Sequence, residues 1–407
     1  MRVAFLTHEP FHPPSGGGSA EAPYLIREFV RRGHEVHLFC PEFPDAPAVA
    51  ERFGIRTHLF TRWRMGRYAR LRNLKYLLYP AALARLVRDT AATPALRGAG
   101  FDLIFAQHTI SAVAAAQLRR QLRTPVVLNF LDYLTGFMET WPAWVMPGPL
   151  VRQLTRYELS LPRRAAAEGV LTVSQPLAER FAATGYPRER LCAIQYGYDA
   201  ALFRPAEADL SGAAPTLVMH GSFDHHHLGA IALEAMTRIA AARPDVGLRL
   251  VGRETPALRA FVARLRTRAP GLRVTTTGFV PYEAVAREVA SATVGLVPYQ
   301  ESNGTHCAFV AKAVEYLGCG IPVASTPLEN LRGYFAREPA IRFSEFHGAG
   351  FAAAVLAWIE TPAAERRRLG LAAAGRVAAA LDWSAVTSRA AAFAESTVAA
   401  AALPAGH

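Results

Sequence analysis

The 407-residue sequence has few cysteines and no long hydrophobic run. Its four cysteines are scattered and form no C-x-x-C pair, which excludes a disulfide framework and indicates a reducing compartment. No stretch of eighteen apolar residues occurs, so we expect no transmembrane helix. The apolar run at the N-terminus is too short for a secretory signal and is typical of a buried first strand. We therefore expect a cytoplasmic protein.

Charged side chains are also scarce, at 19% of the residues, whereas hydrophobic residues make up 51%. This composition is typical of a globular protein and excludes a disordered chain. The formal net charge of +12 favours polyanionic partners. No signature of a nucleic-acid-binding module follows, so we expect no nucleic acid partner. Phosphorylated ligands and acidic lipid headgroups remain as candidates.

Short apolar segments alternate with helical segments along the first half of the chain. Arg2–Thr7 and Glu35–Cys40 have the composition of buried strands, and Ala20–Arg32 between them repeats apolar residues at helical spacing. Further strands are expected at 101–106, 125–129 and 169–173. This β-α-β alternation predicts a parallel sheet with helices on both faces.

A second series of the same kind follows residues 203–215, where proline, glycine and small residues indicate a linker. Its strands are expected at 216–220, 247–251, 273–277, 294–298 and 322–325. A chain of this length also favours two domains. We therefore predict an α/β protein with two Rossmann-like domains, residues 1–205 and 206–384. Ligands of such sheets bind at the carboxyl ends of the strands, so we expect a cleft between the domains.

Candidate binding groups follow three strands of the first predicted domain. Ser15–Ser19, with Gly17 and Gly18, opens a helix directly after the first strand, which suits a diphosphate. The segment lacks G-x-G-x-x-G spacing, which disfavours a dinucleotide, and a flexible surface turn is the alternative. His108 and Asp132 each follow a later strand and are candidates to bind a sugar hydroxyl or exchange a proton. Alternatively, both are capping groups or satisfied buried groups.

A carboxylate and a lysine lie on one predicted helix of the second domain. Glu315 is flanked by apolar residues, which favours a buried carboxylate that binds ribose hydroxyls over a solvated helix face. Lys312 on the same helix adds positive charge. The preceding loop, residues 302–306, offers N–H and hydroxyl groups to a phosphate, and Thr305 is the candidate there.

Two further segments have more than one interpretation. Residues 224–227 read Asp-His-His-His, but consecutive residues of a strand or helix cannot all face one ion. We expect no metal there and interpret the segment as a polar loop or a phosphate contact. Residues 63–88 interleave basic and aromatic side chains, so they form either a solvated helix with aromatics packed inward or a segment lying on an anionic membrane.

Six segments together resemble the retaining GT-B glycosyltransferases of family 4, and in the order typical of that family. They are the glycine loop with residues 28–37, and residues 170–178, 194–205, 277–281, 312–323 and 381–384. The resemblance implies a GT-B fold whose C-terminal helix, residues 385–407, packs back on the first domain. It also implies sugar transfer with retention of configuration and without a metal or other cofactor.

The same resemblance assigns roles to particular residues and partners. Gly17 and Gly18 would contact the diphosphate of a nucleotide-sugar donor, His108 the transferred sugar and Glu315 the ribose. Val280 lies in the loop beside the base. The acceptor would be a glycan, a lipid-linked sugar or a small metabolite, with an anionic membrane as a further peripheral partner.

Three positions depart from the family pattern. Ser222 and Leu228 replace an arginine and a lysine that normally bind the diphosphate, and Cys307 replaces a carboxylate. The candidate substitutes for the missing cations are His226, His227, Arg253 and Lys312. These departures leave open a degenerate protein that binds a sugar nucleotide or a partner subunit without turnover. A sugar-nucleotide epimerase of the same fold has no distinct signature here.

Overall fold

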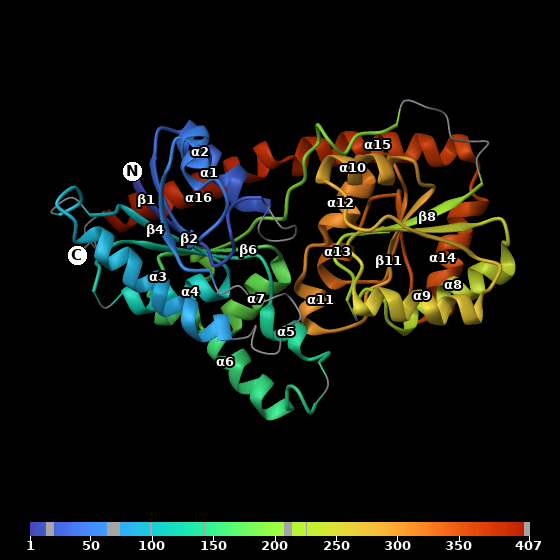
Figure 1. Cartoon of the computed structure of the whole chain (residues 1–407), viewed down its shortest axis with the longest axis horizontal. Helices are drawn as coiled ribbons and strands as arrows, with labels where there is room; N and C mark the ends of the chain where they lie inside the picture. The colour runs from blue at the N-terminus through green and yellow to red at the C-terminus, as the bar shows by residue number, and fades with distance from the viewer. Residues whose placement is uncertain are drawn as a thin grey trace. The chain divides into compact units, whose positions relative to one another are not determined.

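Two parallel sheets organise the computed structural model of the protein, one in each of two compact units (Figure 1). The structure describes residues 1–13, 20–62, 74–97, 100–119, 121–141, 143–206, 214–224 and 226–402. The first unit comprises residues 1–195 with 384–407, and the second comprises residues 196–383. Gly17 and Gly18, and residues 63–73 of the basic aromatic segment, lie outside the described residues.

The sheet of the first unit has the order β3-β2-β1-β4-β5-β6-β7. Every residue of β4 and β5 is buried, which explains why these strands are continuous apolar runs in the sequence. The strands are β1 (Arg2–Leu6), β2 (Glu35–Pro41), β3 (Arg56–Phe60), β4 (Leu103–Gln107), β5 (Val126–Phe130), β6 (Gly169–Thr172) and β7 (Leu191–Ala193). The strand order reverses direction at β1, so β1 and β4 border the position where ligands of such sheets bind.

Helices cover both faces of this sheet: in Figure 1, α1 and α2 lie on one face and α3 and α4 on the other. The helices of the unit are α1 (Glu21–Arg31), α2 (Ala46–Phe53), α3 (Lys75–Ala91), α4 (His108–Leu118), α5 (Leu134–Met138), α6 (Gly148–Arg164), α7 (Gln175–Ala183) and α16 (Trp383–Ala402). In α3, Leu77 and Leu78 are exposed, whereas Leu83 and Val87 are buried. No described helix is both long enough and apolar enough to cross a bilayer.

The sheet of the second unit has the order β10-β9-β8-β11-β12-β13, again reversing direction, here at β8. Its strands are β8 (Thr216–His220), β9 (Gly247–Val251), β10 (Arg273–Thr276), β11 (Val294–Val297), β12 (Val323–Ser325) and β13 (Ile341–Phe343). Its helices are α8 (Ala230–Ala242), α9 (Pro256–Arg268), α10 (Tyr282–Ala290), α11 (Asn303–Cys307), α12 (Ala311–Gly318), α13 (Glu329–Tyr334), α14 (Gly348–Glu360) and α15 (Ala363–Leu381). Both sheets are parallel, so the predicted α/β class is confirmed.

The units divide between Gln195 and Tyr196, before the boundary expected at residue 205. The reason is that the segment after Gln195 packs on the second unit. The Tyr198 N–H donates to the Leu381 carbonyl at 3.0 Å, and the Tyr198 ring lies against Gly318. Burial of these aromatic contacts ties the segment to the second unit, which the composition of the expected linker does not reveal.

The C-terminal helix α16 packs on the first unit. A Cβ at Gly169 in β6 would lie 2.8 Å from the Thr397 hydroxyl of α16. Glu395 of α16 pairs with Arg32 and with His34, each at 2.7 Å. Close approach to a glycine, an ion pair with Arg32 and a hydrogen bond with His34 thus fix α16 on this unit.

Alanine substitutions at two glycines of α15 are predicted to change the free energy of unfolding in opposite directions. A Cβ at Gly370 would collide with the backbone carbonyl of Gly320, whereas a Cβ at Gly375 meets no atom of the described residues within 4 Å. We expect Gly370→Ala to lower the free energy of unfolding by about 2 kcal/mol, because backbone cannot move aside cheaply. Gly375→Ala should raise it by about 0.5 kcal/mol through helix propensity. Urea unfolding measures both, and equal effects would contradict the packing.

Candidate functional site

Predicted site residues of the second unit come together at the carboxyl end of β8. His220, the last residue of β8, places its Nε2 2.6 Å from Glu315 Oε2 of α12. The Tyr282 hydroxyl, at the start of α10, donates to Glu315 Oε1 at 3.1 Å. Glu315 is only 8% exposed, as its apolar neighbours predicted. The carboxylate is therefore held from two sides at the ligand edge of the sheet.

The surroundings of Glu315 favour its ionised form. Burial by itself raises the pKa of Glu315, but the charge of His220 and the hydrogen bonds from His220 and Tyr282 outweigh burial, with a further contribution from Lys312. The pKa of Glu315 therefore lies below its ordinary value. At neutral pH the site presents an ionised acceptor of hydrogen bonds, which suits vicinal hydroxyl groups.

Lys312 lies one turn before Glu315 on α12 and reaches back to the end of β8. A Cβ at Gly221 would lie 2.7 Å from Lys312 Cε, and Gly221 has a φ of +105°, so only glycine fits there. Lys312 Nζ donates to the Tyr299 hydroxyl at 2.9 Å and lies 3.3 Å from His227 Nε2. The ammonium group is thus positioned beside the backbone that follows β8.

The histidine-rich segment forms a turn. The N–H groups of His227 and Leu228 both point to the Asp224 carbonyl, at 3.2 and 3.1 Å. Because the chain turns, Asp224 Oδ1 lies 3.0 Å from His226 Nδ1 and 2.6 Å from His227 Nδ1. Three of the four side chains therefore converge, because these residues lie on a turn and not on a strand or helix.

These three side chains could hold a metal ion by distance alone, because one ligand atom of each lies within 4.8 Å of the others. The positive charge of Lys312 opposes that interpretation. A metal at His227 Nδ1 would put the proton on Nε2, which could then donate to the Tyr299 hydroxyl at 2.9 Å, but it would also add positive charge to an imidazole that lies 3.3 Å from the ammonium of Lys312. The arrangement fits a carboxylate–imidazole pair better than a metal ligand set. Burial lowers the pKa of His227 to about 3, and the charge of Lys312 adds to this effect.

The remaining predicted residues of this unit have different environments. Ser222 follows Gly221 and is half-buried. The Arg253 guanidinium lies 5.2 Å from the centre of the exposed Phe279 ring, next to Val280. Arg253 and Val280 thus follow the neighbouring strands β9 and β10.

Thr305 has a structural role within α11. Its hydroxyl donates to the Gln300 carbonyl at 2.9 Å and accepts from the Ser302 N–H at 2.9 Å. Its own N–H donates to the Ser302 hydroxyl at 3.0 Å, which completes a capping box. The side chain predicted to face a phosphate is therefore engaged in the cap.

In the first unit, His108 and Asp132 follow the adjacent strands β4 and β5. His108 is buried, has a φ of +68°, and packs edge-on against His8 with ring centres 5.1 Å apart. A positive φ is unfavourable for a residue with a side chain and is found mostly where surrounding structure imposes it. Asp132 is exposed. The His108 side chain is thus buried, whereas the Asp132 side chain is exposed to solvent.

Glu21 is a buried residue at the carboxyl ends of β4 and β5 that sequence reasoning missed. Its Oε2 accepts hydrogen bonds from Gln107 Nε2 at 2.8 Å and from Asn129 Nδ2 at 2.7 Å, at the ends of β4 and β5. Burial raises the pKa of Glu21 to about 7, against the effect of these two amides. The available signal was an acidic residue directly after the glycine loop, with an amide at the end of each of two strands.

Glu158 of α6 is a second missed residue, and it connects the segments that carry His108 and Asp132. It accepts from the Thr109 hydroxyl at 2.8 Å, and from the Thr135 N–H and hydroxyl at 2.9 and 2.6 Å. Burial raises the pKa of Glu158 in spite of these bonds. No local pattern around Glu158 indicated this role, because its partners lie far away in sequence.

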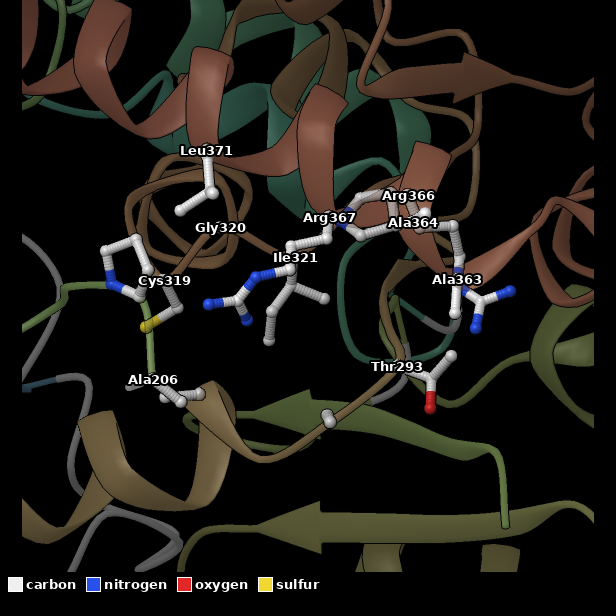
Figure 2. A pocket seen from close by; sticks show the side chains of 14 residues that line it. Ala206, Thr293, Cys319, Gly320, Ile321, Ala363, Ala364, Arg366, Arg367 and Leu371 are labelled. Carbon is white, nitrogen blue, oxygen red and sulfur yellow. The ribbon is translucent and has the colours of Figure 1, made fainter. Parts of the chain in front are cut away.

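A cavity of about 310 Å³ lies in the second unit, away from these residues. Figure 2 shows Ile321, Arg367 and Leu371 among the side chains that line it. Thr293 and Pro322, which also line it, directly precede β11 and β12. The cavity is therefore at the amino ends of these strands, the edge opposite to His220, and is not the candidate site.

Two family models match most of the chain. Residues 16–197 match the glycosyl transferase 4-like domain, and residues 214–361 match glycosyl transferases group 1. No curated protein sequence matches the chain. The first segment begins after β1 and contains the other strands of the first sheet, and the second segment contains the strands of the second sheet.

Solved structures of similar fold cover almost the whole chain. Sucrose-phosphate synthase from Thermosynechococcus elongatus aligns with a TM-score of 0.76 and 18% identity, over 98% of this chain and 99% of its own. Anabaena HepE, in complex with UDP and glucose, aligns with a TM-score of 0.71 and 19% identity, over 97% and 100%. Trehalose 6-phosphate synthase from Burkholderia multivorans has a TM-score of 0.68 and 15% identity, over 98% and 99%. These matches confirm the predicted pair of Rossmann-like domains.

Proposed function

Since this chain belongs to the glycosyltransferases of family 4 type, we propose that it transfers a sugar from a nucleotide-diphosphate sugar to an acceptor hydroxyl with retention of configuration. One observation carries the proposal: a buried carboxylate, Glu315, lies at the carboxyl end of β8, with Lys312 on the same helix. A carboxylate accepts hydrogen bonds from ribose hydroxyls, and an ammonium attracts phosphate. The two side chains thus match two adjacent parts of a nucleoside diphosphate.

The donor is proposed to bind to the second unit. Glu315 binds the ribose, Lys312 the diphosphate, and Val280 lies beside the base with Arg253 nearby. The HepE structures with UDP and glucose, and with UDP-glucose, support a nucleotide-sugar donor of this kind. UDP sugars are therefore the first donors to test.

In the proposed reaction, the bond between the anomeric carbon and the diphosphate oxygen breaks, and negative charge develops on the leaving diphosphate. The acceptor oxygen bonds to the anomeric carbon on the same face, and the acceptor's proton passes to the leaving diphosphate. The ammonium of Lys312 and the positive N-terminus of α12 stabilise that charge, so the reaction requires no metal or other cofactor. On the acceptor side we propose His108 as a contact to the transferred sugar and Asp132 as a proton-exchanging group. Gly17 and Gly18 are proposed to contact the diphosphate.

The acceptor class is proposed more broadly as a glycan, a lipid-linked sugar or a small metabolite. The alternative function is a degenerate protein that binds a sugar nucleotide or a partner subunit without turnover. Ser222, Leu228 and Cys307 favour that alternative, because they replace the arginine, the lysine and the carboxylate found at these positions in the family. The retention of the glycine loop, His108 and Glu315 favours the active enzyme.

A thermal-shift panel of UDP, GDP, ADP, CMP and dTDP sugars tests the donor site. A ligand at about 100 times its Kd adds roughly 2.7 kcal/mol to the free energy of unfolding, which raises Tm visibly. We expect a rise with one nucleotide only, followed by release of that nucleoside diphosphate when acceptors are added. Absence of any rise across the panel would overturn the donor-site proposal, and binding without release on any acceptor would favour the degenerate protein.

A further inference from the structure

Four side chains form a continuous series of contacts beside Lys312. Asp224 Oδ1 lies 2.6 Å from His227 Nδ1, His227 Nε2 lies 2.9 Å from the Tyr299 hydroxyl, and that hydroxyl lies 2.9 Å from Lys312 Nζ. His227 and Tyr299 are 4% and 5% exposed, so water does not compete strongly for these contacts. The series runs from a carboxylate to an ammonium through a buried imidazole and a buried phenol.

The ammonium of Lys312 fixes the direction of the two hydrogen bonds that join Lys312, Tyr299 and His227. The ammonium of Lys312 can only donate, so the Tyr299 oxygen accepts from it. The Tyr299 proton then points to His227 Nε2, which must be unprotonated to accept it. The remaining imidazole proton then lies on Nδ1, and an Asp224 carboxylate oxygen lies 2.6 Å from that nitrogen. Neutral His227 is thus the form that suits both neighbours, a carboxylate at Nδ1 and a donating phenol at Nε2.

The four residues come from three elements that meet at the ligand edge of the sheet. Asp224 and His227 lie in the turn after β8, Tyr299 follows β11, and Lys312 lies in the first turn of α12. Strands β8 and β11 are hydrogen-bonded neighbours. These contacts therefore hold Lys312 against Gly221, at the ligand edge of the sheet. The phosphates of the proposed donor bind at the same place.

Neither of the positions at which the family places its arginine and lysine supplies a positive charge here. Leu228, at the position where the family places a lysine, is 6% exposed and belongs to the apolar core beneath the turn. Ser222 carries no charge. The ammonium of Lys312 instead lies beside Gly221, 3.4 Å from where a Cβ at Gly221 would be.

We infer that Asp224, His227 and Tyr299 are positioning residues that hold Lys312 as the diphosphate-binding cation of this enzyme, in place of the family's arginine and lysine. The inference rests on the proposed function. A free lysine side chain loses rotamer entropy when it binds a phosphate, whereas a lysine already held in place does not lose it again. Other charged groups that face this series are Glu315, which is paired with His220, and His226, which contacts Asp224.

The test compares the affinities for UDP and UMP, with the GDP/GMP and ADP/AMP pairs measured in the same way by calorimetry. Lys312→Ala should lower the affinity for the diphosphate by about 10- to 100-fold, because a charge-assisted hydrogen bond is lost. Tyr299→Phe should lower it by about 3- to 10-fold. The affinity for the monophosphate should change little in either variant. The same affinities are measured for Asp224→Asn and His227→Gln, which change the other two positioning residues.

The decisive measurement is the double variant Lys312→Ala with Tyr299→Phe. If Tyr299 acts through Lys312, the double variant binds the diphosphate as weakly as Lys312→Ala alone. A residue that only stabilises the fold would lower the affinities for diphosphate and monophosphate together, and its effect would add to that of Lys312→Ala. Tyr186→Phe is the matched control, since it removes the hydrogen bond of a buried phenol to the Ala167 carbonyl in the first unit.

The outcomes separate this inference from the proposed function. If the unmodified protein binds no nucleotide of the panel, the proposed donor site is wrong and the inference falls with it. If it binds the diphosphate tightly but Lys312→Ala binds equally well, the donor site stands and the role of Lys312 is overturned. Additive effects of Tyr299→Phe and Lys312→Ala would overturn the positioning role alone.

Discussion

Replacing Glu315 by glutamine is expected to lower the affinity for the nucleotide-sugar donor by roughly 100-fold, because one hydrogen bond to ribose is lost and the other is no longer assisted by the charge of the carboxylate. The amide of glutamine offers only one acceptor oxygen, and its N–H₂ group faces either His220 or Tyr282, which both contact the native carboxylate. Calorimetry with the nucleotide that raises Tm measures the loss. Circular dichroism of the same variant checks that it is folded.

Alanine at position 315 would lower both the stability of the fold and the affinity for the donor, so the two effects could not be separated. Glu315→Ala leaves His220 without its buried partner, which costs about 3 kcal/mol of folding free energy in addition to any loss of binding. The control is Glu338→Gln in the same unit. Glu338 has a side chain that is 6% exposed and pairs with Arg376 at 2.8 Å. Unchanged donor affinity in Glu315→Gln, or an equal loss in Glu338→Gln, would contradict the ribose assignment.

Replacing Glu21 by glutamine is expected to make the protein more stable at pH 8 and to leave it nearly unchanged at pH 5. The folded state raises the pKa of Glu21 from 4.5 to about 7. Between these values the folded state retains a proton that the unfolded state has released, so the stability of the native protein falls as pH rises. The shift corresponds to about 3 kcal/mol, complete above pH 7.

Glutamine resembles the protonated carboxyl group and does not titrate, so it removes this dependence. Its oxygen can still accept from Gln107 and Asn129, and Gln107 Oε1, which has no hydrogen-bond partner among the described residues, is available to its N–H₂ group. Urea unfolding at pH 5, 6, 7 and 8 measures the effect. Exposed Glu51→Gln is the control and should follow the native protein. Parallel pH curves for Glu21→Gln and the native protein would contradict a buried, proton-retaining carboxyl.

The fold could be predicted because its determinants are local. Strands β4 and β5 are buried on both faces and therefore appear as continuous apolar runs, and helix α1 ends where Gly33, with a φ of +80°, stops it. The burial of Glu315 was predictable for the same reason, since Val314 and Tyr316 beside it are apolar. The division at residue 195 was not predictable, because it depends on the contacts of Tyr198 with Gly318 and Leu381, more than a hundred residues away.

The sequence alone therefore determined the two parallel-sheet domains, the family, and the helix that carries Lys312 and Glu315, because periodicity, turn residues and motif spacing are properties of neighbouring residues. Only the tertiary structure decided which polar groups meet. It brought Glu21 to Gln107 and Asn129, and it joined His227 to Tyr299 and Lys312. These pairings depend on which strand ends lie side by side in a sheet. The order of the strands is set by packing across the whole domain, so it cannot be predicted from a short segment of the sequence.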